Sequence, residues 1–259
     1  MDWNRAKNVI IGMLLLVNLF LLGMMGYLRL QETRSFRESV EGTVRVLASR
    51  GIGVDESLIT GKKDERRLCI IERDRTREAA VAQNLLGISE VSASGGNDRY
   101  KGEWGTAAWL SGGNFDAGFT ANAAQFEQAL RDSGIALPEG WTAGATGEIG
   151  QYIDGLPIFN CGLRYVIGGS TCTVSGRYCL GKPQPVDDRA PMGECSVLIS
   201  YASIVSGLAI ERIDAMDPGW VVQTLPGIGV RLIPVWRITS PGLVTYVNAV
   251  DGSAVLVEG

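Results

Sequence analysis

Residues 150–180, GQYIDGLPIFNCGLRYVIGGSTCTVSGRYCL, constrain the fold more than any other stretch of the chain. Two runs rich in β-branched and aromatic residues, Ile158–Ile167 and Thr171–Leu180, flank a turn that contains Gly168-Gly169-Ser170. Runs of this kind, bounded by glycine and serine, are typical of a β-hairpin. We therefore predict two antiparallel strands here, with Gly155-Leu156-Pro157 as a turn ahead of the first strand.

The chain after this hairpin predicts one helix followed by a series of strands. A proline-containing loop over Lys182–Met192 precedes a predicted helix over Glu194–Leu208. Turn residues such as Asp217-Pro218-Gly219 and Pro241-Gly242 then separate short runs with strand character. The predicted strands are Ala209–Met216, Trp220–Gln223, Arg231–Thr239, Leu243–Val250 and Ala254–Val257. Residues 145–259 are expected to form an α+β unit, in which a helix packs on a mostly antiparallel sheet.

The chain before the hairpin predicts a second unit of the same class over residues 34–137. The predicted helices are Arg34–Gly51, Asp74–Leu86 and Ala121–Ser133, and the predicted strands are Arg67–Ile71, Arg99–Leu110 and Asn114–Phe119. Asp74 and Thr120 are the expected N-terminal caps of the second and third helices. Pro138-Glu139-Gly140 breaks the chain between the two units. The predicted fold class is thus α+β, with two units that have antiparallel sheets.

The N-terminal part of the chain carries a long apolar run. Val9–Leu28 reads VIIGMLLLVNLFLLGMMGYL and holds twenty residues without a charge. As a helix this run would be about 30 Å long, which matches the hydrocarbon thickness of a bilayer. We expect a single transmembrane helix at residues 9–28, a cytoplasmic tail at 1–8, and extracytoplasmic α+β units. A cleaved signal peptide or a buried soluble helix are the alternatives.

Small and apolar residues form a stripe along this predicted helix. The stripe consists of Gly12, Leu16, Leu19, Gly23 and Gly26. Glycines at such spacing let a partner helix approach closely, so we predict these residues, together with Asn18 on another face, as partner-binding. The alternative is that a single helix simply carries a stray glycine or asparagine.

Composition excludes several classes of function. The net charge is −4 and the sequence pI is about 5.1, which argues against nucleic-acid binding. The chain has no histidine, which excludes Ser-His-Asp and Cys-His catalysis and histidine metal sites. No phosphate-binding glycine motif is present. We therefore predict no enzyme activity and no catalytic, cofactor-binding or metal-binding residues. The basic residues between Arg29 and Arg77 fit either a solvated surface or contact with anionic lipid or an acidic partner.

Cysteines and tryptophans leave two further questions open. The cysteines are Cys69, Cys161, Cys172, Cys179 and Cys195. A hairpin turn of three residues at Gly169–Thr171 would place Cys161 opposite Cys179, where a disulfide could form, and free buried thiols are the alternative. The tryptophans outside the N-terminal segment are Trp104, Trp109, Trp220 and Trp236, which fit either a core or a ligand groove.

Three motifs carry a resemblance to a known family. Met1-Asp2-Trp3-Asn4-Arg5-Ala6-Lys7 runs directly into the apolar segment, and QYIDGLPIF at 151–159 precedes a strand. LIPVWRI at 232–238 is followed by YVNAVDG at 246–252. The chain resembles the YycH/YycI regulators of Gram-positive bacteria, and its length is closer to that of YycI. Its C-terminal part resembles PepSY-like modules.

The resemblance implies a regulator rather than a catalyst. The expected partners are a cell-wall-related sensor histidine kinase and a paralogous single-pass regulator, in a homo- or hetero-oligomer at the cell membrane. The Met-Asp-Trp start implies that the N-terminus is cytoplasmic. Two other classes stay open: a module that binds peptides or cell-wall fragments, and a sporulation-linked membrane protein with a PepSY-like domain. A pocket lined by Trp104, Trp109 or Trp236 with convergent polar groups would favour the binding module.

Overall fold

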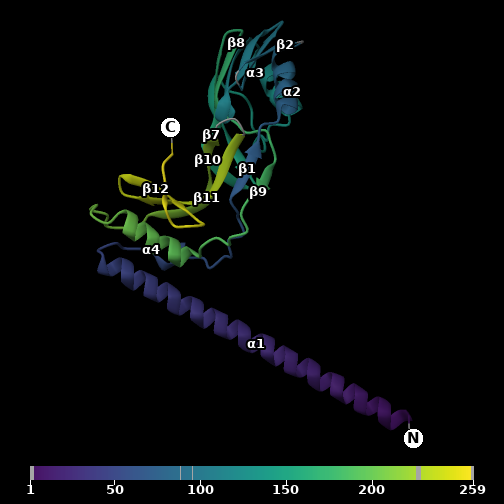
Figure 1. The fold of residues 1–259 in the computed structure, drawn as a ribbon, viewed down its shortest axis with the longest axis vertical. Coiled ribbons are helices and arrows are strands. Elements are labelled where there is room, and N and C mark those ends of the chain that lie inside the picture. Colours follow the sequence, from purple (N-terminus) through teal and green to yellow (C-terminus); the bar gives the residue numbers. More distant parts are fainter. Residues whose placement is uncertain (1–2, 88, 95, 226–228, 258–259) are drawn as a thin grey trace.

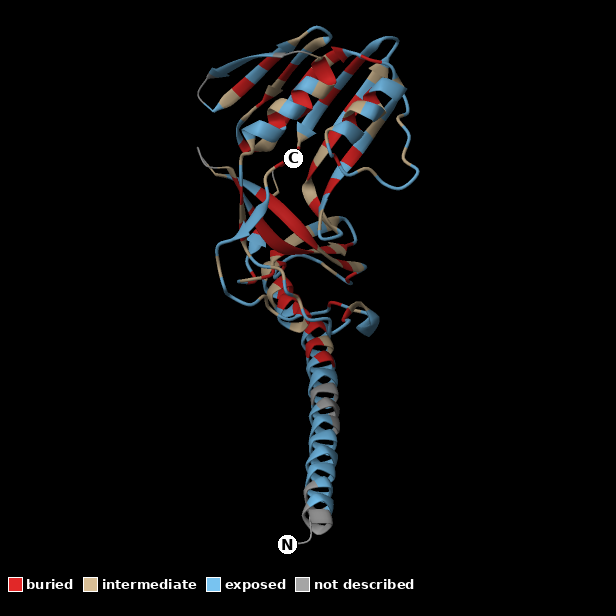
Figure 2. Cartoon of the chain, turned by 90° about the vertical axis from the view of Figure 1, so that its right-hand side faces the viewer, coloured by how far each residue is buried: buried red, intermediate tan, exposed pale blue. Residues whose placement is uncertain are grey.

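The computed structural model describes residues 3–87, 89–94, 96–225 and 229–257. Its longest element is helix α1 (Trp3–Ser49), which projects from the rest of the molecule (Figure 1). Only the C-terminal end of α1 joins a core: Val40 and Leu47 are buried against helix α4 (Glu194–Ile204). The side chains of the preceding turns are exposed wherever the structure describes them (Figure 2).

The predicted transmembrane helix is contradicted. Across the residues with a described structure, no helix is both long enough and apolar enough to cross a membrane, so the single-pass localisation is not supported. The prediction assumed a transmembrane helix that begins at Val9 and ends at Leu28. In the structure this run is part of one helix that continues without a break through Arg34 and Glu41 to Ser49, and the end of that helix packs in a core. The side chains of Val9, Ile10 and Gly26 lie outside the described part of the chain.

Over the described residues, the strands form one 13-stranded sheet (Figure 1). The strands are β1 (Cys69–Glu72), β2 (Ser89–Ser94), β3 (Asn97–Gly102), β4 (Gly105–Trp109), β5 (Asn114–Thr120), β6 (Thr146–Ile153), β7 (Leu156–Gly168), β8 (Thr171–Arg177), β9 (Pro183–Pro185), β10 (Ala215–Leu225), β11 (Gly229–Ser240), β12 (Leu243–Asn248) and β13 (Ala254–Val255). The strand order is β13-β12-β11-β10-β7-β8-β5-β4-β3-β2, while β1 pairs with β11 and β9, and β6 pairs with β7.

The predicted α+β class with two antiparallel units is therefore wrong, and the fold is a mixed α/β arrangement around one sheet. Two features of the sheet are the reason. Strand β7 pairs in parallel with β10, through Ile158 and Trp220, and antiparallel with β6 and β8. The halves that the sequence separates are joined by two antiparallel pairs, β5 with β8 and β1 with β11. The boundaries 34–137 and 145–259 remain a prediction about domain organisation, but their strands belong to the same sheet.

Two main hydrophobic clusters lie on this sheet. Helices α2 (Arg75–Leu86) and α3 (Ala123–Asp132) bury Leu86 and Phe126 against strands that include β5, β7 and β8. Helix α4 and the end of α1 bury Leu198 and Leu47 against β10 and β11. The first cluster contains side chains from both predicted units, which are joined there by the pairing of β5 with β8. Two short 3₁₀ turns, Glu56–Leu58 and Ser111–Gly113, complete the elements.

The predicted hairpin is present, but its turn is one residue shorter than the turn on which the pairing of Cys161 with Cys179 was based. Gly168 pairs with Thr171, so the turn has the two residues Gly169 and Ser170. Two-residue turns suit the right-handed twist of paired strands when glycine supplies a positive φ, and Gly169 has φ +64°. The assumed three-residue turn at Gly169–Thr171 is wrong, which shifts the register between β7 and β8 by one residue.

Candidate functional site

The main candidate site is a cleft of about 690 Å³ over the pair β10 and β11, here called the tryptophan cleft. Trp220 lies opposite Pro234, and Trp236 lies opposite Pro218, so both indoles lie on one face of the strand pair. Their side chains are largely buried, at 4% and 6% exposure. Leu156, Pro183 and Pro185 add to the lining. The cleft has the size and the aromatic lining of small-ligand and peptide sites.

One wall of the cleft is a segment without regular structure, residues 60–67, here called the strap. It is fixed at one end by Glu194, the first residue of α4, which is buried. The Glu194 carboxylate accepts hydrogen bonds from the Thr60 hydroxyl at 2.7 Å and from the Gly61 N–H at 2.8 Å. A carboxylate at a helix N-terminus is also stabilised by the helix dipole. Glu194 therefore fixes both the strap and the start of α4.

Arg66 fixes the other end of the strap. Its guanidinium donates to both carboxylate oxygens of Asp64, at 2.9 and 2.6 Å, and to the carbonyl oxygens of Gly219 and Val235. The Arg66 and Asp64 side chains are each only 8% exposed. Buried charges are stable when paired and hydrogen-bonded in this way.

The same guanidinium lies between the two tryptophans. Its central carbon is 5.9 Å from the Trp220 ring and 5.2 Å from the Trp236 ring, within the range of cation–π attraction. The Nε1 atoms of both indoles are buried and have no hydrogen-bond partner among the described residues. A buried donor without an acceptor is unfavourable.

The rim of the cleft carries charges that the chain itself does not pair. Lys62, Lys63, Glu65 and Asp154 are exposed and line the cleft. In the part of the chain that the structure describes, none of them takes part in an ion pair. The cleft thus combines an aromatic floor with free ammonium and carboxylate groups at its edge. Such a site can bind a ligand, but it holds no general acid–base pair in hydrogen-bond contact.

The predicted ligand-groove tryptophans are only partly brought together. Trp220 and Trp236 meet in the cleft, whereas Trp109 is 1% exposed in the core beside Phe115. Trp104 is 48% exposed beside Gly87, at a different place on the molecule. Sequence reasoning missed Arg66 as a site residue. The spacing of Asp64 and Arg66 alone does not indicate a site, because the carbonyl groups that Arg66 binds lie on distant strands of the sheet.

The predicted partner-binding residues lie along the exposed part of α1. Gly12, Leu16, Asn18, Leu19 and Gly23 are exposed, and a Cβ added at Gly12 or Gly23 meets no atom within 4 Å. The Asn18 amide donates to its own helix, to the Leu14 carbonyl at 2.9 Å. Gly26 lies in the same helix, but its surroundings fall outside the described residues. Their role as a contact surface stays a prediction.

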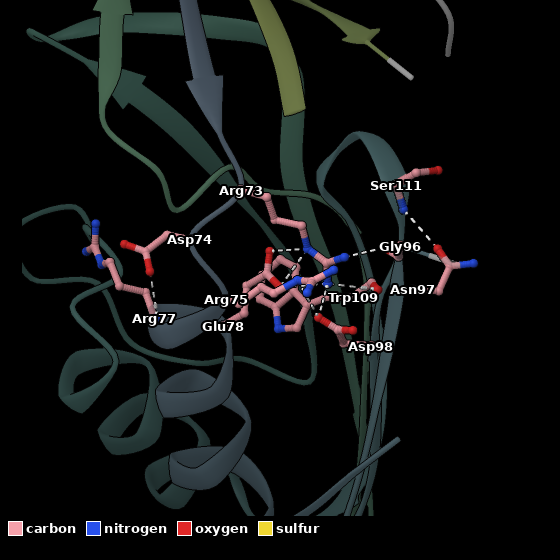
Figure 3. Close-up of polar contacts among 10 residues, drawn as sticks. All are labelled: Arg73, Asp74, Arg75, Arg77, Glu78, Gly96, Asn97, Asp98, Trp109 and Ser111. Atoms are coloured by element: carbon pink, nitrogen blue, oxygen red, sulfur yellow. Dashed lines mark hydrogen bonds and ion pairs between the residues drawn. The ribbon is translucent and has the colours of Figure 1, made fainter. Parts of the chain in front are cut away.

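A second polar cluster surrounds Arg73, between β1 and α2 (Figure 3). Arg73 forms ion pairs with Glu78 at 2.7 Å and Asp98 at 3.0 Å, and donates to the carbonyl oxygens of Gly96 and Trp109. Burial raises the pKa of Glu78, while Arg73 acts in the opposite direction. This cluster joins the start of α2 to the β2–β3 turn and the end of β4. We interpret it as structural, because nearly every donor of Arg73 is already used.

Metal binding gains no support from the described residues, which contain no group of three or more Cys, Asp and Glu side chains placed to hold an ion.

Comparison with known proteins gives little information about this chain. No protein-family model and no curated protein matches the chain. A solved structure with partial similarity is an uncharacterized protein from Eubacterium rectale, at 10% identity and a TM-score of 0.40, over 74% of this chain and 86% of that chain. A likeness of this degree carries no information about function.

Proposed function

We propose that the chain is a binding module that takes an extended peptide into the tryptophan cleft. The observation that carries this proposal is the pair of buried tryptophans, Trp220 and Trp236, on one face of a cleft of about 690 Å³. Grooves lined by aromatic side chains recognise extended proline-rich peptides, because such peptides lose little conformational entropy on binding. The unpaired Lys62, Lys63 and Asp154 at the rim supply groups for the peptide's own charges.

The chemistry of the cleft favours a peptide over a phosphorylated or strongly charged ligand. The lining charges balance, with Lys62, Lys63, Arg66 and Arg67 against Asp64, Glu65, Asp154 and Glu194. A peptide presents backbone carbonyl oxygens, which suit the exposed ammonium groups of Lys62 and Lys63 at the rim. It also presents apolar side chains for the aromatic floor. The edge strand β9 is a poor docking edge, since two of its three residues are prolines that lack an N–H.

The test is selection from a library of random octapeptides on the purified chain, followed by titration of a selected peptide by calorimetry. We expect Trp236→Leu to weaken binding by at least about tenfold, as loss of an aromatic anchor usually does. Trp104→Leu is the matched control, because Trp104 is exposed outside the cleft. Lys63→Glu on the rim is a second variant that does not disturb the core. Equal binding by all variants, or no selected peptide, would refute the proposal.

A second candidate is the regulation of a sensor histidine kinase, which the resemblance to YycI suggests. It is favoured by the exposed apolar side chains of α1, such as Leu16 at 70% and Phe20 at 66%, since an exposed apolar surface of this length usually marks a contact site. A Cβ added at Gly12 or Gly23 meets no atom within 4 Å, so isoleucine fits at both positions within the chain itself. Gly12→Ile with Gly23→Ile should reduce co-purification of the kinase, and unchanged capture would argue against this contact.

A further inference from the structure

Two cysteines from different strands meet in the interior of the sheet. Cys161 lies on β7, and Cys179 lies two residues beyond the end of β8. Both are buried in the same hydrophobic cluster, at 6% and 8% exposure. Gly150 pairs with Gly162, so the next residue of β6, Gln151, lies beside Cys161. All five cysteines are free thiols in this structure.

Regular strand pairing would not bring these two residues together. Gly162 lies opposite Arg177, so the ladder between β7 and β8 would place Cys161 opposite Tyr178 rather than Cys179. The ladder ends at Arg177, and the chain then turns toward β6. There the buried Gln151 side chain makes two hydrogen bonds with the Cys179 backbone, accepting from its N–H at 2.9 Å and donating to its carbonyl at 2.6 Å. Gln151 thereby holds Cys179 next to Cys161.

Cys179 differs from Cys161 in its access to small molecules. It lines a cavity of about 290 Å³ next to the Arg73 cluster, whereas Cys161 does not line this cavity. Gly113 forms the wall beside the Cys179 sulfur, and a Cβ at this glycine would be only 3.0 Å from that sulfur. The absence of a side chain at Gly113 therefore leaves space around Cys179.

We propose that Cys161 and Cys179 form a dithiol site that a low-molecular-weight disulfide oxidises to an internal disulfide. The Cys179 thiolate attacks one sulfur of the small disulfide, which yields a mixed disulfide and releases one small thiol. Cys161 then loses its proton and attacks the Cys179 sulfur, which releases the second small thiol. Two electrons and two protons pass from the two cysteines to the small disulfide, and the sulfurs of Cys161 and Cys179 become bonded to each other.

The surroundings assign the order of these steps. The hydrogen bond with Cys179, and then burial, raise the pKa of Cys161, so Cys161 keeps its proton in the resting state. The thiolate is the reactive form of cysteine. Of the two cysteines, Cys179 is the one that lines the cavity, where a small disulfide can reach it. Cys179 is thus the attacking residue and Cys161 the resolving residue. The bond would link β7 to the segment that follows β8.

The test treats the purified full chain with 2-hydroxyethyl disulfide and maps its peptides without reduction. We expect a linked peptide that contains Cys161 and Cys179. Cys161→Ser should stop at a stable mixed disulfide on Cys179, and Cys179→Ser should leave Cys161 unmodified. Cys172→Ser is the matched control. Cys172 is buried in a different cluster, the one under helices α2 and α3, where burial raises its pKa to about 11.

Three outcomes would overturn the proposal. The first is that no Cys161–Cys179 peptide forms although the partly exposed Cys195 is fully modified, which shows that the reagent was active. The second is that Cys161 links to Cys69, which shares the cluster. The third is that Cys161 in the Cys179→Ser variant reacts as fast as Cys179 does in the unaltered chain. The linked peptide is measured in the unaltered chain, so the main test does not depend on the folding of a variant.

Discussion

Replacing Arg66 with methionine tests the architecture of the tryptophan cleft. Methionine keeps a long apolar stem but removes the guanidinium, so the Asp64 carboxylate loses two hydrogen bonds while it stays 8% exposed. The carbonyl oxygens of Gly219 and Val235 lose their donor in the same step. Removal of one member of a buried ion pair costs about 3–5 kcal/mol, because the remaining charge is still desolvated.

We therefore expect Arg66→Met to lower the free energy of unfolding by about 3–5 kcal/mol, which is a large share of the roughly 5–15 kcal/mol of a typical domain. Unfolding in urea, followed by tryptophan fluorescence, is the appropriate assay, since Trp220 and Trp236 lie against the altered side chain. The midpoint should shift to lower urea with little change in slope. In a double variant, Asp64→Asn should recover part of the loss, because it removes the uncompensated charge.

Arg67→Met is the matched control for this experiment. Arg67 is the next residue and also forms an ion pair, at 2.9 Å with Asp188, but the two side chains are 51% and 100% exposed. Exposed pairs contribute about 0–1 kcal/mol, so this variant should be close to the unaltered chain. If Arg66→Met and Arg67→Met have the same small effect, the buried guanidinium does not hold the strap on the sheet and the reasoning is refuted.

Three further predictions concern other parts of the molecule. Burial raises the pKa of Glu78 above its ordinary value of 4.5, so its stabilising contribution is complete below pH 4.5 and is lost as the pH rises through the folded-state pKa. Unfolding free energies measured across this range should therefore fall less with rising pH in Glu78→Gln than in the unaltered chain. Gly102→Ala should destabilise the fold by about 1–3 kcal/mol in urea unfolding, because its Cβ would lie 2.4 Å from the Leu86 carbonyl oxygen. Gly118→Ala on the nearby strand β5 meets no atom within 4 Å and should stay within about 0.5 kcal/mol. A chain that begins at residue 35 keeps the buried Val40 and Leu47 of α1 and should unfold at the same urea concentration as the full chain, whereas aggregation under several conditions would contradict this.

Local signals in the sequence predicted local structure well. The predicted strand Ile158–Ile167 lies inside β7, and Thr171 begins β8 as expected. Asp74 caps α2 as predicted, since its side chain accepts from the Arg77 N–H at 3.1 Å. These features depend on residues close together in the chain, so side-chain type and spacing are enough to identify them.

Local rules failed where a distant strand competes for the same residue. Thr120 was the expected cap of α3, but it pairs with Thr171 at the end of β5, and Asn122 caps the helix instead, in a capping box with Gln125. Asp217-Pro218-Gly219 was expected as a turn, but it lies within β10. Proline is tolerated there because β7 pairs with β10 at Trp220 and not at Pro218.

The two candidate sites show the same limit more strongly. Arg66 binds carbonyl groups 153 and 169 residues away along the chain, and Gln151 holds Cys179 across 28 residues. No motif encodes such contacts, because they exist only once distant strands have paired, β1 with β11 in the first case and β6 with β7 in the second. The cysteine pair shows that strand register alone does not determine which residues are neighbours. A mistaken register predicted that Cys161 would face Cys179, and the correct register alone would separate them. The buried amide of Gln151, on the strand that pairs with β7 beside Cys161, holds the Cys179 backbone in place. Where a site is formed by side chains that satisfy buried backbone groups, its residues can be found only after the sheet topology is known.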